Sequence, residues 1–120
     1  MKKALLFVTL GLVFLLASCS SPKSVVEKWA SAIEAGDSAK AESLCDGKQT
    51  VEATKFMVEA FKKASDKDKE EFKNRVITAD DKDNDGERAA VSLKVGKEER
   101  VILVGKKKDG WKITSFGLEL

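Results

Sequence analysis

The spacing of apolar residues changes once along this chain, and the change comes at Arg75. Before it, apolar residues recur every three or four positions, as in the helical stripe Val25, Val26, Trp29, Ala30 and Ile33. After it they alternate with polar residues, as in the strand-like series Ala89, Val91, Leu93 and Val95. Helices followed by consecutive strands predict an α+β domain whose N-terminal helices pack on one face of an antiparallel sheet.

Capping residues set the expected ends of the first helix. It is expected to begin at Ser21 or Ser24, and Ser24 with Glu27 matches a capping box. Gly36 is expected to end it, because glycine adopts the left-handed conformation that closes many helices.

Three shorter helical segments are expected before the strands. Asp37 is expected to cap a helix over residues 38–45. A third helix is expected over residues 51–64, and Ser65 with Asp68 signals a fourth helical turn.

The second half of the chain predicts a meander of short strands, at residues 75–79, 89–95, 99–105 and 111–116. Asp109-Gly110 is a strong signal for the last hairpin turn. The alternation also predicts a core, in which one face of the sheet covers Trp29 and Ile33. The strand residues expected in that core are Val91, Leu93, Ile102, Val104, Trp111 and Ile113.

Residues 1–18 have the pattern of a secretory signal peptide. Met1-Lys2-Lys3 supplies a positive start, and a predominantly apolar segment of fourteen residues follows from Ala4 to Ala17. A helix of this length is too short to cross a bilayer, which takes about 20 residues. We therefore expect this segment to be removed from the mature protein.

The end of the apolar run, Leu16-Ala17-Ser18-Cys19, resembles a bacterial lipobox. The resemblance implies cleavage before Cys19 and attachment of diacylglycerol to its sulfur, usually with a further acyl chain on the new amino terminus. Several chains anchor a protein firmly, because each buried methylene contributes about 0.8 kcal/mol. Ser20, which is not an aspartate, resembles the sorting pattern for release to the outer membrane. The expected location is the cell envelope, at the periplasmic face of the outer membrane.

The predicted mature chain has no excess of either charge. Loss of Lys2 and Lys3 from the 22 basic residues leaves 20 of them against 20 acidic residues. A neutral chain lacks the field that drives binding to nucleic acid, so no nucleic-acid partner is expected. The predicted layout is a signal peptide at 1–18, a lipidated cysteine and short linker at 19–23, and an α+β domain at 24–120.

Residue types that commonly carry chemistry are missing, because the sequence contains neither His nor Tyr. With Cys19 joined to lipid, Cys45 has no cysteine left for a disulfide within the chain. A cysteine nucleophile needs an activating base, and no His is present, so Cys45 is interpreted as a small buried thiol on the second helix. We expect neither a catalytic residue nor a cofactor.

The stretch DDKDNDGERAAV can be interpreted in two ways, as a calcium-binding loop or as a turn between two strands. Asp81, Asp83 and Asp85 stand at the first three ligand positions of a calcium loop, with Gly86 at its sixth position. The twelfth position, however, is Ser92 where such a loop has a bidentate Glu, and a strand follows in place of a helix. We therefore predict a turn between two strands, with a weak metal site at the three aspartates as the alternative.

The order of motifs in the mature chain resembles a known family. A helix, then Gly36-Asp37 and a second small helix, and later DNDGERAAVSLKV and KKDGWKI, resemble small bacterial lipoproteins of the nuclear-transport-factor-2-like superfamily, in the group called domain of unknown function 4878. The resemblance covers about Pro22 to Phe116. It implies a cone, in which a curved sheet wraps the first helix as in cystatin-like folds, often with a pocket inside. Trp29 and Trp111 are expected either in the core or lining that pocket.

Two classes of function stay open on the sequence alone. The first is a membrane-anchored, non-catalytic binding or scaffold module whose partner is an envelope protein or another envelope component. The second is a small-ligand-binding or enzymatic domain that uses the cavity of the cone. A filled cavity favours the first class, and an open one with convergent polar groups favours the second.

Overall fold

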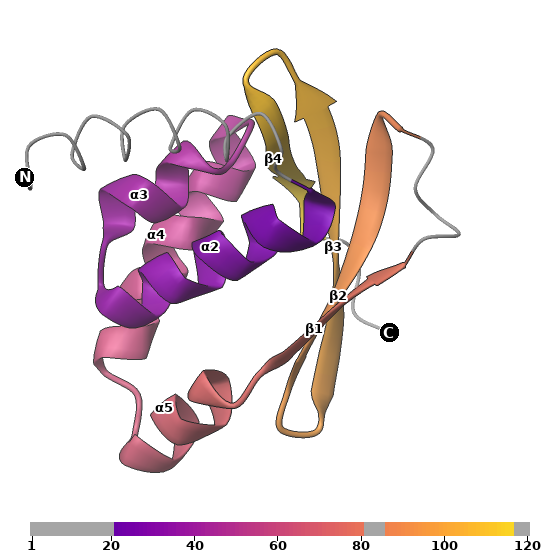
Figure 1. The fold of residues 1–120 in the computed structure, drawn as a ribbon. Coiled ribbons are helices and arrows are strands. Elements are labelled where there is room, and N and C mark those ends of the chain that lie inside the picture. The colour runs from indigo at the N-terminus through magenta and orange to yellow at the C-terminus, as the bar shows by residue number, and fades with distance from the viewer. Residues whose placement is uncertain (1–20, 81–85, 117–120) are drawn as a thin grey trace, which may run out of the picture.

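The computed structural model describes residues 21–80 and 86–116, and it places helices on one side of an antiparallel sheet (Figure 1). The described helices are α2 (Pro22–Ala35), α3 (Ser38–Ser43), α4 (Lys48–Lys62) and α5 (Asp66–Lys73). They are followed by the strands β1 (Val76–Asp80), β2 (Arg88–Val95), β3 (Glu98–Lys107) and β4 (Gly110–Ser115). The predicted α+β class and the order of its elements are confirmed.

Helix α2 begins earlier than the predicted capping box implies. Ser21 is the N-cap, and its hydroxyl accepts a hydrogen bond from the backbone N–H of Ser24. The Ser24 hydroxyl in turn accepts from the Ser21 N–H at 2.9 Å, so Ser24 takes the place expected for Glu27. Pro22 suits the first helical position because its ring fixes φ and it has no N–H to leave unpaired. The helix therefore starts inside the segment 19–23 that the sequence assigned to a linker.

The starts of α3 and α5 follow the predicted caps, whereas α4 spans Lys48–Lys62 and so begins before the expected range 51–64. The carboxylate of Asp37 accepts from the Lys40 N–H, and the hydroxyl of Ser65 accepts from the Asp68 N–H, as predicted. Helix α3, however, ends at Ser43, so the prediction that Cys45 lies on it is wrong. The reason is tertiary, because the segment around Cys45 instead forms a short parallel bridge with β4.

The sheet is a simple meander with the order β1-β2-β3-β4, and every pairing is antiparallel. Two-residue turns join β2 to β3 and β3 to β4, where Val95 pairs with Glu98 and Lys107 with Gly110. At Gly96, in the first of these turns, φ is +62° and a side chain would crowd the Glu71 carboxylate. The residue at this position therefore has to be glycine or accept considerable strain.

The predicted core is confirmed. The six expected strand residues are buried together with Trp29 and Ile33, and α2 contacts all four strands. The register explains this arrangement, because Val91 pairs with Ile102 and Val104 pairs with Ile113 across neighbouring strands. Alternate residues of a strand point to one face, so these side chains all meet the helices.

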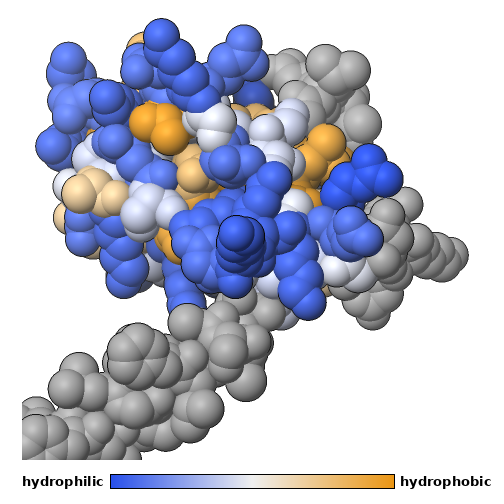
Figure 2. Space-filling view, turned by 90° about the horizontal axis from the view of Figure 1, so that it is seen from above, coloured by the Kyte–Doolittle hydropathy of each residue, from blue (hydrophilic) through white to orange (hydrophobic). Residues whose placement is uncertain are grey.

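The surface outside this core is strongly polar. The face shown in Figure 2 is mostly hydrophilic, with small hydrophobic patches between hydrophilic side chains. Three large apolar side chains stand out as exposed among the described residues, namely Phe56, Val76 and Leu103.

Candidate functional site

A groove of about 690 Å³ opens between α4, α5 and the helix-facing side of β2 and β3. Its volume falls in the range of about 300–1,000 Å³ that is usual for small-molecule sites. Most of its lining is aromatic or aliphatic. The lining residues are Trp29, Ile33, Phe56, Met57, Ala60, Phe61, Ala64, Asp68, Phe72, Leu93, Val95, Glu98, Arg100, Ile102 and Phe116.

Trp29 of α2 forms the deep end of the groove. Its side chain is 2% exposed, and its ring lies 5.2 Å from the ring of Phe116, at an angle of 35°. Its indole Nε1–H donates to the hydroxyl of Thr54 at 3.1 Å, so the buried polar atom of the ring is satisfied. The hydrogen bond fixes the orientation of the indole between α4 and the sheet.

The Thr54 hydroxyl also forms a hydrogen bond with Cys45, which lies outside the groove lining. The hydroxyl oxygen is 3.2 Å from the Cys45 sulfur, which in turn contacts the Ala41 carbonyl oxygen at 3.5 Å. Burial raises the pKa of the Cys45 thiol above its ordinary value, although the hydrogen bond with Thr54 opposes the shift. A thiol with a raised pKa stays protonated near neutral pH, so it is a poor nucleophile and a poor metal ligand.

Two aromatic side chains from different helices form the outer wall. The rings of Phe61 on α4 and Phe72 on α5 lie 5.3 Å apart, inclined at 56°. Phe56, five residues earlier on α4, also lines the groove but is 74% exposed. The groove therefore presents aromatic surface to solvent, and an exposed apolar patch bordered by polar residues is typical of a ligand-binding groove.

The charged lining residues lie toward one end of the groove. Glu98, Arg100 and Ile102 occupy alternate positions on β3, so their side chains lie on the same face of the strand. Asp68 comes from α5, and all three charged residues are exposed. The strand thus passes from a buried apolar residue to charged residues near the turn between β2 and β3.

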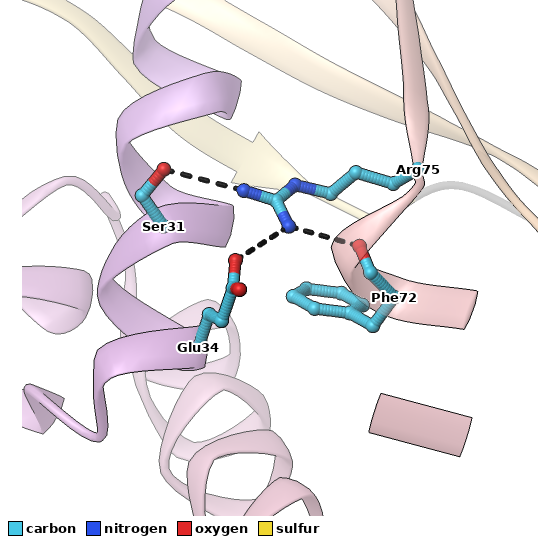
Figure 3. Close-up of polar contacts among 4 residues, drawn as sticks. All are labelled: Ser31, Glu34, Phe72 and Arg75. Carbon is cyan, nitrogen blue, oxygen red and sulfur yellow. Dashed lines mark hydrogen bonds and ion pairs between the residues drawn. The ribbon is translucent and has the colours of Figure 1, made fainter. Parts of the chain in front are cut away.

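Arg75, between α5 and β1, ties α5 to α2 (Figure 3). Its Nη1 donates to Glu34 Oε1 at 2.8 Å and to the Phe72 carbonyl oxygen at 2.9 Å, and its Nη2 donates to Ser31 Oγ at 3.2 Å. The guanidinium carbon also lies 4.8 Å from the centre of the Phe72 ring. Because no residue of α5 is buried, these contacts do much to hold Phe72 in the wall of the groove.

The two predicted tryptophans end up in different surroundings. Trp29 lines the groove, whereas Trp111 is 9% exposed in the core and lies outside the groove lining. Cys19, the predicted lipidation site, lies outside the described residues, as do Asp81, Asp83 and Asp85. Within residues 21–80 and 86–116 there is no group of three or more acidic or cysteine side chains placed to hold a metal ion.

The elements on either side of the acidic stretch are strands. β1 ends at Asp80 and β2 begins at Arg88, and the two pair antiparallel with Asp80 opposite Ala90. The prediction that this stretch connects two strands is therefore confirmed. A calcium loop of the helix–loop–helix type would need helices in both positions.

Sequence reasoning missed most of the groove. Phe56 falls off the apolar stripe of α4, and an aromatic residue on the polar side of a helix was the signal that could have identified it. Phe72 and Phe116 gave no such signal, since a single apolar residue near the end of an element is ordinary.

Comparison with protein-family models, with curated proteins and with solved structures finds no match to this chain. Among the described helices, none combines the length and the apolar character needed to cross a bilayer. The assignment of a function therefore depends on the groove and on the sequence of the N-terminal segment.

Proposed function

We propose that the domain is a non-catalytic binding module and that the groove between α4, α5 and the sheet binds a small apolar or amphiphilic ligand. The observation that carries the proposal is the apolar lining of an open groove, with Phe56 at its mouth 74% exposed. Sites of this kind bind through buried apolar surface, and a few polar groups orient the ligand.

Binding rather than catalysis is supported by where the polar groups lie. General acid–base chemistry needs titratable groups held in a site that excludes water. Asp68, Glu98 and Arg100 are instead exposed at the rim of the groove. Cys45 lies outside the lining, and its raised pKa keeps the thiol protonated.

The groove is tested with a neutral fluorescent probe, N-phenyl-1-naphthylamine, and a soluble chain of residues 21–120. Every buried core residue in the described part lies between Val25 and Ile113, so this chain contains its own core. We expect Phe56→Ser to weaken probe binding by about tenfold, because burying a large apolar side chain contributes about 1.5–3 kcal/mol. Probe fluorescence measures the affinity.

Val76→Ser is the matched control for this experiment. Val76 is also an exposed apolar residue, but it lies on β1 and outside the groove lining. The control is expected to bind the probe as tightly as the unmodified domain. Absence of probe binding, or an equal loss in both variants, would contradict the proposed site.

We also propose that the protein is a bacterial lipoprotein, anchored by acyl chains on Cys19 at the periplasmic face of the outer membrane. The lipobox-like sequence supports the proposal. Helix α2 begins at Pro22, and the two intervening residues span at most about 11 Å from Cys19 at about 3.6 Å per residue. An anchored domain would thus lie against the bilayer surface, where amphiphiles are available as ligands.

The anchor is tested with Cys19→Ala in the full chain. We expect complete loss of acylation and accumulation of the precursor, because the thioether has no sulfur on which to form. Metabolic labelling with a radioactive fatty acid and fractionation of the membranes measure both effects. Cys45→Ala is the control and should be labelled as strongly as the natural chain. A mature protein whose mass shows no lipid on Cys19 would contradict the assignment.

The finer fold assignment is likewise a proposal. We propose that α2 and the sheet form the cone of the nuclear-transport-factor-2-like superfamily, in the group called domain of unknown function 4878. In support, α2 contacts every strand, and the register shifts between Leu103 and Val104, where a bulge would bend the sheet around the helix. The groove would then be the open end of the cone.

A further inference from the structure

The charged residues of the groove divide it into an apolar body and a polar end. Ile102 on β3 lies beside the apolar lining residues, and Arg100 and Glu98 follow on the same face toward the β2–β3 turn. Arg100 is opposite Leu93 and Glu98 is opposite Val95 in the register, and both of these partners also line the groove. A ligand that fills the apolar part would place one of its ends beside these charges.

Helix α5 brings a further carboxylate to the same end. Asp68 lines the groove from α5, and the Glu71 carboxylate of that helix lies against Gly96 in the β2–β3 turn. The polar end is therefore bounded by α5 on one side and by the hairpin on the other. Its lining carries one guanidinium and two carboxylates.

This combination of charges selects among the head groups of amphiphiles. An anionic head group would be attracted by Arg100 but repelled by Asp68 and Glu98. A cationic head group would be attracted by the two carboxylates but repelled by Arg100. A head with both a phosphate and an ammonium group satisfies both signs at once. A guanidinium has five N–H donors, so Arg100 can bond phosphate oxygens alongside its other contacts.

We infer that the groove binds an amphiphile with a single alkyl chain and a zwitterionic phospho-amine head, with the chain against Trp29, Phe61 and Ile102 and the head between Arg100 and the carboxylates of Asp68 and Glu98. The inference rests on the proposed function, since it requires the groove to be a binding site. It adds the chemical class of the ligand and its direction in the groove.

Four amphiphiles with the same twelve-carbon chain test the inference. They are dodecylphosphocholine, dodecyl phosphate, dodecyltrimethylammonium and dodecyl maltoside, each titrated below its micelle-forming concentration into residues 21–120 and followed by calorimetry. We expect dodecylphosphocholine to bind about threefold to tenfold more tightly than each of the others, because exposed charge pairs contribute modestly. Equal affinity for all four would overturn the inference and leave the proposed groove standing. Binding of none would overturn both.

Adjacent residues of the sheet supply matched variants. Arg100→Gln is expected to weaken binding of dodecylphosphocholine about threefold and to leave dodecyl maltoside unchanged, whereas Lys94→Gln, in β2 and outside the groove lining, should alter neither. Glu98→Gln is expected to tighten binding of dodecyl phosphate by a similar factor.

Glu99→Gln is the control for Glu98→Gln. Glu99 lies on the opposite face of β3, where it accepts a hydrogen bond from Ser92. The Glu99→Gln substitution should leave the affinities for all four amphiphiles unchanged. If Glu98→Gln and Glu99→Gln behaved alike, or if Arg100→Gln weakened all four amphiphiles equally, the proposed position of the head group would be wrong.

Discussion

Ile102→Ala is expected to lower the free energy of unfolding of the domain by about 2–5 kcal/mol, which is the usual cost of truncating a fully buried Ile or Leu to Ala. Ile102 is 2% exposed at the centre of the sheet, and it pairs with Val91 on β2. Three methyl or methylene groups leave the core, and the surrounding strands cannot close the space without disturbing their register. Urea denaturation followed by circular dichroism measures the loss, and the melting temperature should fall by at least about 8 °C.

The next residue on the same strand is the control. The Leu103 side chain points to the other face of β3 from Ile102 and is 39% exposed. Leu103→Ala should therefore lower the free energy of unfolding by less than about 1 kcal/mol. Two substitutions of similar size, one residue apart, then report on the two faces of β3. Equal losses, or a melting temperature of Ile102→Ala that matches the natural domain, would show that the face of the sheet toward α2 has been misassigned.

The sheet and its core could be predicted because period-two alternation fixes which side chains share a face. Once Val91 and Leu93 are placed inside, the neighbouring strands have to place Ile102 and Ile113 on the same side. That logic needs no knowledge of long-range contacts, since antiparallel strands joined by two-residue turns pair in a register that the turn sets. The structure confirms each of these positions as buried.

The starts of α3 and α5 were predicted because a local cap decides them, and the end of α3 was missed because a distant segment decides it. Asp37 and Ser65 cap the helices that follow them, because a cap bonds to an N–H only three residues away. Cys45 was placed on α3, but the Asp46 N–H donates to the Ile113 carbonyl oxygen and the Ile113 N–H donates to the Leu44 carbonyl oxygen. These bonds to β4 replace further helical turns, and nothing near Cys45 in the sequence indicates them.

The groove could not be predicted because it is made by elements that lie far apart in the chain. Phe61, Phe72 and Ile102 contribute to one lining from α4, α5 and β3. Each of them has the spacing of an ordinary core residue, and sequence spacing does not say whether the space between elements is filled. The choice between a filled and an open cavity, which the sequence left undecided, depends on where α5 sits.

The position of α5 depends strongly on Arg75, and Arg75→Met is expected to lower the free energy of unfolding by about 2–3 kcal/mol. The variant leaves the Glu34 carboxylate, itself 34% exposed, without the guanidinium 2.8 Å away. The cost is less than the roughly 3–5 kcal/mol of a fully buried pair, because water reaches Glu34. Arg75→Lys should also be destabilising, by about 1–2 kcal/mol, since one ammonium cannot reach Glu34, Ser31 and the Phe72 carbonyl oxygen in the geometry of the planar fork.

Lys62→Met is the control, because it removes a surface ion pair that does not hold α5 in place. Lys62 and Glu59 are 3.3 Å apart, but both side chains are more than half exposed, so their loss should cost less than about 1 kcal/mol. Amide hydrogen exchange shows which elements are destabilised. The Arg75→Met substitution should increase the exchange rates of the α5 amides more than those of the β2 and β3 amides. Neutral-probe affinity should fall as well, because Phe72 loses the ring contact and the backbone bond that hold it in the groove wall. Equal costs for Arg75→Met and Lys62→Met, or unchanged exchange in α5, would mean that α5 is held by its other contacts and that the groove does not depend on Arg75.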